Sequence, residues 1–247
     1  MNGNSRNILG AVLAGGRSSR MGRDKAGLLM GQDTFLARAL RAVRSVCPET
    51  VISLRPDAPC RAAAEKAGKT VWDDGLHGPM GGLAACLEEA GKSGFTAVLA
   101  CACDMPFLSA DVLEIVCRAR KNRSSGTLVT APLLPGRKKP EPLCAVWETA
   151  ALPDIRAALA EGRLSLFRAL PLRTWHIFPC PVSLSAELSN VNTPDELAAL
   201  ETSGNEAGPA PLPPEKKHII LRKRPFPSRP SRPGVPAARP NLLEKRV

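Results

Sequence analysis

The sequence predicts an α/β protein, a three-layer α/β/α sandwich with a mostly parallel, Rossmann-like sheet. Short apolar runs alternate along the chain with amphipathic stretches, which is typical of strands separated by helices. The runs are apolar throughout rather than at every second position, as expected for strands that are buried on both faces. Glycines and cations follow the first run directly, and ligands in such sheets bind at the carboxyl ends of the strands.

The first half of the chain alternates strands and helices regularly. The run ILGAVLA at 8–14 is predicted to be a buried strand, and residues 33–46 are predicted to be a helix. That helix is indicated by apolar residues at three-and-four spacing, namely Phe35, Leu36, Ala39, Leu40 and Val43. Further strands are expected at 50–54, 70–72 and 96–102, with helices at 58–68, 80–91 and 109–121. Ser109 is placed to cap the last of these helices.

The second half is less regular but continues the pattern. Two strands are expected at 126–132 and 141–147, on either side of the turn LLPGRKKP. Helices at 151–162 and 164–170 and an edge strand at 173–179 follow. A last helix is predicted at 193–201, with Thr193 as its N-cap, Pro194 at its first position and Glu196 as the capping-box partner.

The fold is expected to close at residue 201, which gives a domain at 7–201 and a tail at 202–247. The tail holds ten prolines, and ten Lys and Arg against three Asp and Glu give it +7 of the net charge of +11. Such a composition cannot bury enough apolar surface to offset the entropy of ordering, so the tail is predicted to be disordered. Its functional alternative is an arm for an acidic partner or nucleic acid, but Phe226 is its one aromatic residue, so nucleic-acid binding is not expected.

Cysteine usage and hydropathy predict a cytoplasmic protein. The eight cysteines are scattered and no pair has the CxxC spacing of a metal or redox site, so reduced, buried thiols are expected. No stretch has the apolar length of a membrane-spanning helix, and the beginning of the chain lacks a hydrophobic segment of the signal-peptide type.

The stretch LAGGRSSRMGRDK at 13–25 is the first candidate for chemistry. Because it follows the first strand, the N–H groups of Gly15 and Gly16 are expected at the carboxyl edge of the sheet, where they can point at phosphate oxygens. It matches neither the GxGxxG nor the GxxxxGK[ST] pattern. Its positive charges lie at Arg17, Arg20, Arg23 and Lys25. They favour a triphosphate ligand, and the alternative is a basic, solvated loop.

Carboxylates follow two other strands. Asp104, in CDMPF, ends the fourth strand and is placed to hold Mg²⁺ against phosphate oxygens, the alternative being a turn residue before the next helix. Asp73 and Asp74 end the third strand, in WDDGLHGPMGGL, and the glycines after them open a helix whose N-terminus can accept a ligand. The alternative there is a flexible turn, with His77 a solvated loop residue.

Four stretches in this order, LAGGRSSRMGRDK, DDGLHGPMGGL, CDMPF and NVNTPDEL, resemble the molybdenum cofactor guanylyltransferase family, the MobA-type proteins. The resemblance covers roughly residues 7–200 and leaves the tail unexplained. It implies a nucleotidyltransferase domain that uses Mg²⁺, transfers GMP from GTP to the molybdenum-molybdopterin cofactor and releases pyrophosphate. A monomer that contacts other proteins of this pathway is expected, without membrane or nucleic acid among its partners.

The resemblance also implies the residues of the site. Nucleotide binding falls on Leu13, Ala14, Gly15, Gly16, Lys25, Ser53, Asp74 and Asp104. Catalysis, by neutralising charge, falls on Arg20, Lys25 and Asp104, of which Asp104 also binds the metal. Asn190 and Asn192 would lie on the pterin side. Some members have Asn where this chain has Ser53, which leaves that contact open, with Arg55 as the alternative.

Two other functions stay open at this point. A cytidylyltransferase for the same pterin, or another NTP transferase, is the nearer one, although LAGG and GPMGG favour guanine. The other is a catalytically degenerate binding module that uses the basic tail, and the intact Lys25 and Asp104 argue against it.

Overall fold

The computed structural model describes residues 7–16, 24–73, 77–191 and 196. Seven strands form its main sheet, in the order β5-β4-β1-β6-β8-β7-β9. Their bounds are β1 Ile8–Leu13, β4 Thr50–Leu54, β5 Lys69–Trp72, β6 Ala97–Ala102, β7 Val129–Leu133, β8 Cys144–Glu148 and β9 Trp175–Pro179. Strands β5, β4, β1 and β6 are parallel, whereas β8 runs antiparallel between β6 and β7. The mostly parallel sheet is confirmed, and β9 lies at its edge as predicted.

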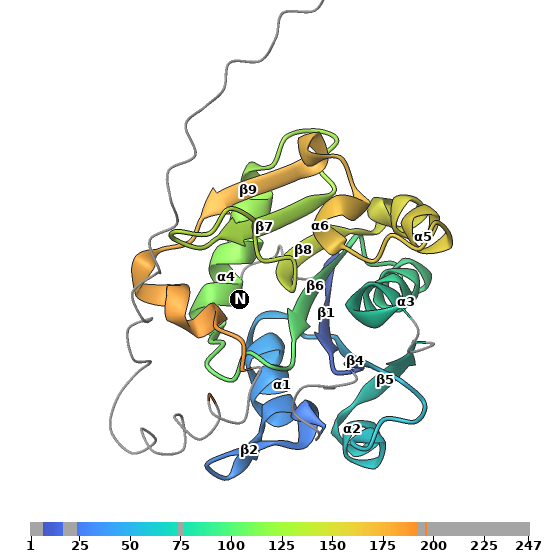
Figure 1. Cartoon of the computed structure of the whole chain (residues 1–247), viewed down its shortest axis with the longest axis vertical. Coiled ribbons are helices and arrows are strands. Elements are labelled where there is room, and N and C mark those ends of the chain that lie inside the picture. Colours follow the sequence, from blue (N-terminus) through green and yellow to red (C-terminus); the bar gives the residue numbers. More distant parts are fainter. Residues whose placement is uncertain (1–6, 17–23, 74–76, 192–195, 197–247) are drawn as a thin grey trace, which may run out of the picture. The chain divides into compact units, whose positions relative to one another are not determined.

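Helices cover both faces of this sheet, which confirms the three-layer sandwich (Figure 1). One face carries α1 (Phe35–Val46), α2 (Arg61–Ala67) and α4 (Ala110–Ala119), and the other carries α3 (Gly78–Lys92), α5 (Leu152–Ala160) and α6 (Leu166–Ala169). Because successive strand residues point to opposite faces, Ile8 and Val12 pack in one apolar cluster and Leu9 and Leu13 in the other. Short 3₁₀ turns are found at Lys25–Gly27, Arg120–Asn122, Thr149–Ala151, Leu172–Thr174 and Val182–Leu188.

A small hairpin precedes α1, and because of it the predicted start of that helix is wrong. Its strands, β2 (Leu29–Met30) and β3 (Asp33–Thr34), pair antiparallel across a turn in which Gly31 has a φ of 67°. The helix expected from residue 33 therefore begins at Phe35. Thr34 stops it from starting earlier, because its extended backbone lets Oγ1 accept a hydrogen bond from the N–H of Ala37 at 3.1 Å.

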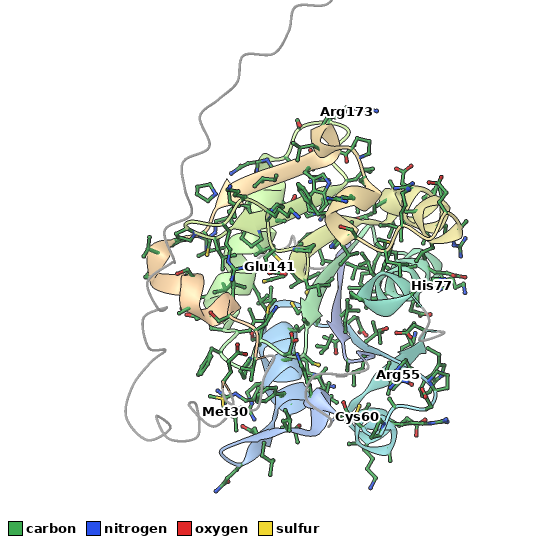
Figure 2. All side chains as sticks on the ribbon, in the orientation of Figure 1. Met30, Arg55, Cys60, His77, Glu141 and Arg173 are labelled. Atoms are coloured by element: carbon green, nitrogen blue, oxygen red, sulfur yellow. The ribbon has the colours of Figure 1, made fainter. Side chains whose placement is uncertain are left out.

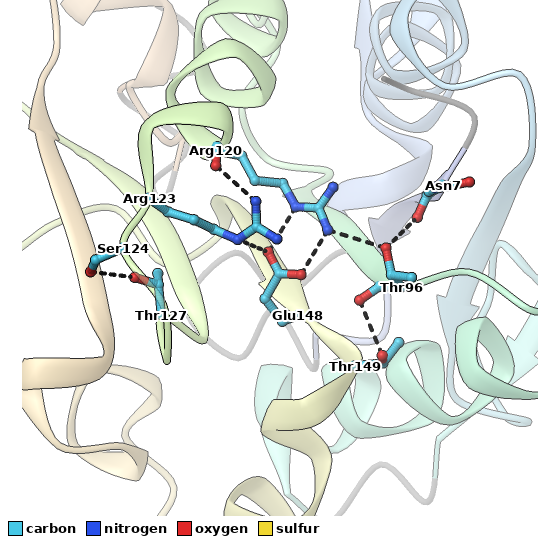
Figure 3. Close-up of polar contacts among 8 residues, drawn as sticks. All are labelled: Asn7, Thr96, Arg120, Arg123, Ser124, Thr127, Glu148 and Thr149. Carbon is cyan, nitrogen blue, oxygen red and sulfur yellow. Dashed lines mark hydrogen bonds and ion pairs between the residues drawn. The ribbon is translucent and has the colours of Figure 1, made fainter. Parts of the chain in front are cut away.

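A buried ion pair joins the 3₁₀ turn after α4 to β8 at the end of the sheet where β6 begins (Figure 3). Arg120 donates to both carboxylate oxygens of Glu148, each at 2.7 Å, and to Oγ1 of Thr96 at 3.2 Å. Arg123 approaches the same carboxylate at 3.2 Å. A bidentate guanidinium pair of this kind fixes geometry as well as charge. The ion pair helps to hold the antiparallel strand β8 in place beside β6 and the parallel strands that follow it in the sheet.

The described chain returns to the carboxyl edge of the sheet after β9. The 3₁₀ turn Val182–Leu188 leads to Val191, which is buried. The helix predicted at 193–201, apart from residue 196, and the tail predicted at 202–247 lie outside the described residues. In the described part of the chain, none of the helices combines the length and the apolar character required to span a bilayer.

Candidate functional site

A cavity of about 220 Å³ opens where β1 and β6 end. The end of β1 and its loop contribute 13–16, the first 3₁₀ turn contributes 24–26, and the end of β6 contributes 102–104. Asp73 and the first turn of α3 form a second wall, while Leu143 and Asn190 close the end beside β8. The cavity thus lies at the carboxyl ends of parallel strands, where open α/β sheets bind their ligands.

Most of the predicted site residues meet in this cavity. Its walls include Leu13, Ala14, Gly15, Gly16, Lys25, Asp104 and Asn190. Ser53 lies behind the wall, fully buried, and its hydroxyl is bonded to a neighbouring side chain. Arg20, Asp74 and Asn192, which the sequence also assigns to the site, fall outside the described residues.

Lys25 and Asp104 form an ion pair at the centre of the cavity. The Lys25 ammonium lies 2.9 Å from Oδ2 of Asp104, and the two side chains are 13% and 19% exposed. Lys25 begins a 3₁₀ turn that is capped by Asp24, whose Oδ1 accepts from the N–H of Ala26 at 3.1 Å. A cation and an anion that are partly desolvated attract each other more strongly than at the surface, so both charges are held in place.

The backbone around Asp104 is fixed by residues that are distant in the sequence. The carbonyl of Asp104 accepts from the N–H of Val191 at 2.9 Å. Two residues further on, the carbonyl of Pro106 accepts from Nε of Arg38, on α1, at 2.8 Å. The loop that holds this carboxylate is therefore tied to α1 and to the returning chain.

The glycine loop after β1 is held just as closely. Nε of Arg55 donates to the carbonyl of Gly15 at 2.9 Å, and the same guanidinium pairs with Asp57 at 2.8 Å. The N–H of Ala14 continues the β1–β4 pairing by donating to the carbonyl of Ser53 at 2.8 Å. From the sequence, Arg55 was the alternative nucleotide contact. In the structure its guanidinium supports the glycine loop.

Asp73 is a cavity residue that the sequence did not select over its neighbour. It is 8% exposed, and Oγ of Ser53 donates to its Oδ2 at 3.4 Å. A Cβ added at Gly15 would lie 2.6 Å from this oxygen, and one added at Gly82 would lie 3.1 Å from it. Two glycines from different elements therefore leave the space that the carboxylate occupies. The resemblance implied Asp74, which lies outside the described residues, and the doublet WDD by itself gave no means of choosing because the end of the strand is uncertain by a residue or two.

The amino end of α3 borders the cavity on the same side. The helix begins at Gly78, which has a φ of 56°, and Pro79 and Gly82 face the cavity. The first N–H groups of a helix lack intrahelical partners, and the helix dipole makes this end positive. Negative or polar groups of a ligand are therefore favoured there.

Glu141 lies beside the other end of the cavity, two residues before the cavity residue Leu143, and was not singled out from the sequence. The N–H of Leu143, a cavity residue, donates to its Oε1 at 3.1 Å. Burial raises the pKa of Glu141, and the negative charge of Asp104 adds to this effect. The signal that could have pointed to it is a carboxylate at the first position of the strand predicted at 141–147, next to the basic turn.

The comparisons with known proteins agree with this geometry. The MobA-like NTP transferase domain matches residues 10–174. A molybdenum cofactor guanylyltransferase of Rhizobium leguminosarum bv. trifolii is 34% identical over 205 residues, which are 78% of this chain and 91% of the relative. A probable molybdenum cofactor guanylyltransferase of Rhodopirellula baltica is 31% identical over 194 residues, 77% of this chain and 90% of the relative.

Solved structures share the fold. Molybdopterin-guanine dinucleotide biosynthesis protein A of Archaeoglobus fulgidus has a TM-score of 0.61 at 24% identity and covers 79% of this chain and 97% of its own. The 2-C-methyl-D-erythritol 4-phosphate cytidylyltransferase of Thermus thermophilus has a TM-score of 0.55 at 18% identity, with 78% and 96% covered. At these identities the likeness concerns the fold alone. The matched domain and the relatives at more than 30% identity go further, and they show that the chain belongs to the MobA-like NTP transferase family.

Proposed function

We propose that this protein transfers GMP from GTP to molybdenum-molybdopterin, forming molybdopterin guanine dinucleotide and releasing pyrophosphate. The observation that carries the proposal is the Lys25–Asp104 pair, set in a cavity between a glycine loop and the amino end of α3. The relatives that are more than 30% identical are molybdenum cofactor guanylyltransferases, which supports both substrates. That the protein works as a cytoplasmic monomer and contacts other proteins of the pathway stays a prediction.

The reaction asks the protein to align two anions rather than to activate a weak nucleophile. The terminal phosphate of molybdopterin carries the attacking oxygen, which forms a bond to the α-phosphorus of GTP. The bond from that phosphorus to the bridging oxygen of the β-phosphate breaks, and pyrophosphate leaves with the electron pair. Positioning and offsetting of negative charge supply most of the rate in such transfers.

The residues of the cavity suit this task. The N–H groups of the loop after β1 would hold phosphate oxygens, and Lys25 would neutralise their charge, with Arg20 assigned the same role. Asp104 offers the hard oxygen ligand that Mg²⁺ prefers, at a place where the Lys25 cation already sits against it. When bound, Mg²⁺ would supply positive charge between phosphate groups.

The remaining assignments divide the cavity into two ends. Asp73, with Asp74 beside it in sequence, would contact the nucleoside, and Ser53 would act by holding Asp73 rather than by touching the nucleotide. Leu13, Ala14, Gly15 and Gly16 would cradle the nucleotide. Asn190 lines the end beside β8, and with Asn192 it would serve the pterin.

A nucleotide panel tests the proposal. Thermal unfolding of the full chain is followed with Mg²⁺ and GTP, CTP, ATP or UTP, and pyrophosphate release is then measured with molybdopterin. GTP is expected to raise the melting temperature most, because a ligand that binds only the folded state stabilises it. Preference for CTP would instead make the protein a cytidylyltransferase. A chain that no nucleotide protects and that releases no pyrophosphate would fit the binding module.

A further inference from the structure

Glu141 lies next to the cavity wall, on the side away from the glycine loop, because its carboxylate accepts a hydrogen bond from Leu143, which lines the cavity. The N–H of Glu141 donates to the carbonyl of Pro132, at the end of β7, at 2.8 Å. Its Oε1 accepts from the N–H of Leu143, whose carbonyl in turn accepts from the N–H of Ala102 at the end of β6. The carboxylate is thus anchored to backbone that itself forms the cavity wall.

This carboxylate has spare capacity as an acceptor. A carboxylate offers roughly four lone-pair positions. Among the residues that the structure describes, the N–H of Leu143 is the one donor that bonds to it. Burial and the charge of Asp104 raise the pKa of Glu141, and the hydrogen bond from Leu143 and the nearby cation of Arg137 counteract them only in part. A ligand that donates hydrogen bonds here would therefore stabilise the ionised carboxylate.

We propose that Glu141 binds the acceptor by taking hydrogen bonds from the 2-amino group and the adjacent ring N–H of a 2-amino-4-oxopteridine. These two donors lie side by side on one edge of the pterin and match the two oxygens of one carboxylate. The assignment rests on the proposed function, since it supplies the recognition of the acceptor that the transfer requires. A partly buried acceptor group is selective, because a ring without the matching donors would leave its remaining acceptor positions unfilled.

Guanine presents the same pair of donors, and the position of Glu141 separates the two rings. Glu141 and Leu143 lead into β8, on one side of β6, while the glycine loop leaves β1 on the other side. Strands β1 and β8 are therefore two strand spacings apart, which is about 10 Å. This distance is too long for a hydrogen bond from a group at the end of one strand to a group at the end of the other. Figure 2 shows Glu141 across β1 and β6 from Arg55 and His77, which border the loop and α3. The guanine end and the Glu141 end are therefore distinct.

The test compares rings that differ only in these donors. Binding of pterin and of lumazine, which has oxygen in place of the 2-amino group, is measured by fluorescence titration of the full chain with GTP and Mg²⁺. Wild-type protein is expected to prefer pterin, and Glu141→Gln to lose that preference. The KM for molybdopterin is expected to rise by about 10- to 100-fold in this variant, the usual effect of removing a hydrogen bond to a charged group, with the KM for GTP unchanged.

Glu114→Gln is the matched control, because Glu114 is an exposed residue of α4 whose ion pair with Arg118 is 3.9 Å long. A wild-type protein that binds both rings equally would overturn the proposal without any variant. A Glu141→Gln variant that keeps the pterin preference would also overturn it. A Glu141→Gln variant that loses the preference for GTP over ITP would also overturn the proposal. Inosine lacks the 2-amino group, so this loss would mean that Glu141 binds guanine. Absence of GMP transfer by the wild type, with the pterin preference present, would instead contradict the proposed function.

Discussion

Individual side chains in this site are held by contacts from several directions. Asp104 receives the Lys25 ammonium on its carboxylate and the Val191 N–H on its carbonyl. Arg38 fixes the following loop through the carbonyl of Pro106. A charge held in this way loses little entropy when substrate binds, which is how preorganised groups lower a barrier.

Replacing Asp104 with Asn keeps its size and removes its charge. We expect GMP transfer to fall by about two to three orders of magnitude, as when one preorganised electrostatic group is lost, while the protein stays folded. Pyrophosphate release at saturating GTP and Mg²⁺ measures the effect, and Asp154→Asn, on the exposed side of α5, is the control. Near-normal transfer by a folded Asp104→Asn variant would exclude the metal and phosphate role.

Gly15 is a position where one methyl group should matter. A Cβ there would lie 2.6 Å from Oδ2 of Asp73, so the buried carboxylate or the loop has to move. We expect Gly15→Ala to weaken GTP binding by about tenfold or more, because small displacements of positioning groups are costly. Titration with GTP tests this, alongside Gly91→Ala on α3, where a Cβ would meet nothing within 4 Å. Equal GTP affinity of Gly15→Ala and Gly91→Ala would show that the site tolerates the displacement of the loop or of the Asp73 carboxylate.

The cysteines should be chemically inert in the folded protein. All eight are free, and burial raises the pKa of Cys60, Cys86 and Cys117 to about 12. A raised pKa keeps a thiol protonated, so at pH 8 only about one thiol in ten thousand is the reactive thiolate. Iodoacetamide at pH 8 is expected to leave these three unlabelled by mass spectrometry until urea unfolds the chain. Rapid labelling of native Cys86 would contradict the buried core.

At the scale of elements, the strand β8 and the chain after β9 complete the site. Strand β8 runs opposite to β6 and so brings its beginning, with Glu141 and Leu143, to the carboxyl ends of the parallel strands. The segment after Val182–Leu188 adds Asn190 and the bond from Val191 to Asp104. The matched domain at 10–174 therefore does not contain the whole cavity.

The Arg120–Glu148 pair should hold β8 in this position. Both side chains are nearly buried, at 6% and 11% exposure, and Glu148→Gln would leave the guanidinium without a matching charge. We expect a loss of about 3 kcal/mol or more in the free energy of unfolding, measured with urea. Glu65→Gln, which breaks an exposed pair on α2, should change it little. The folded Glu148→Gln protein should bind GTP with normal affinity, because the ion pair lies at the end of the sheet opposite the cavity. Reduced GTP affinity would show that the ion pair and the cavity are not independent.

In the molecule as a whole, the described residues that line the cavity come from both halves of the chain. Its walls run from Leu13 to Asn190. We expect removal of 205–247 to leave GMP transfer unchanged, whereas removal from 189 onward should abolish it because Asn190 and the Val191 bond are lost. Pyrophosphate release by the two shortened proteins checks this. A large loss on removing only 205–247 would assign the basic tail a part in the reaction.

The elements of the fold and the Lys25–Asp104 part of the site could be predicted from local sequence patterns. Apolar runs and helical spacing depend on local burial, so the strands from 8–14 to 173–179 and the fold class could be predicted from them. LAGGRSSRMGRDK placed Lys25 in the loop after the first strand and CDMPF placed Asp104 at the end of the fourth, and the structure brings the two together. Even here the start of α1 was missed by two residues, because Thr34 caps the helix after a hairpin that local pattern does not reveal.

Which distant residues share the cavity depends on contacts that form only in the folded chain. These contacts bring Asp73 into the cavity wall, place Ser53 behind it, turn Arg55 onto the carbonyl of Gly15 and bring Glu141 next to the cavity residue Leu143. These relations depend on the strand order, on the antiparallel direction of β8 and on the return of the chain to Asp104. Strand pairing is settled by burial and hydrogen bonding across the whole sheet, between residues far apart in the chain, and no local pattern records that outcome.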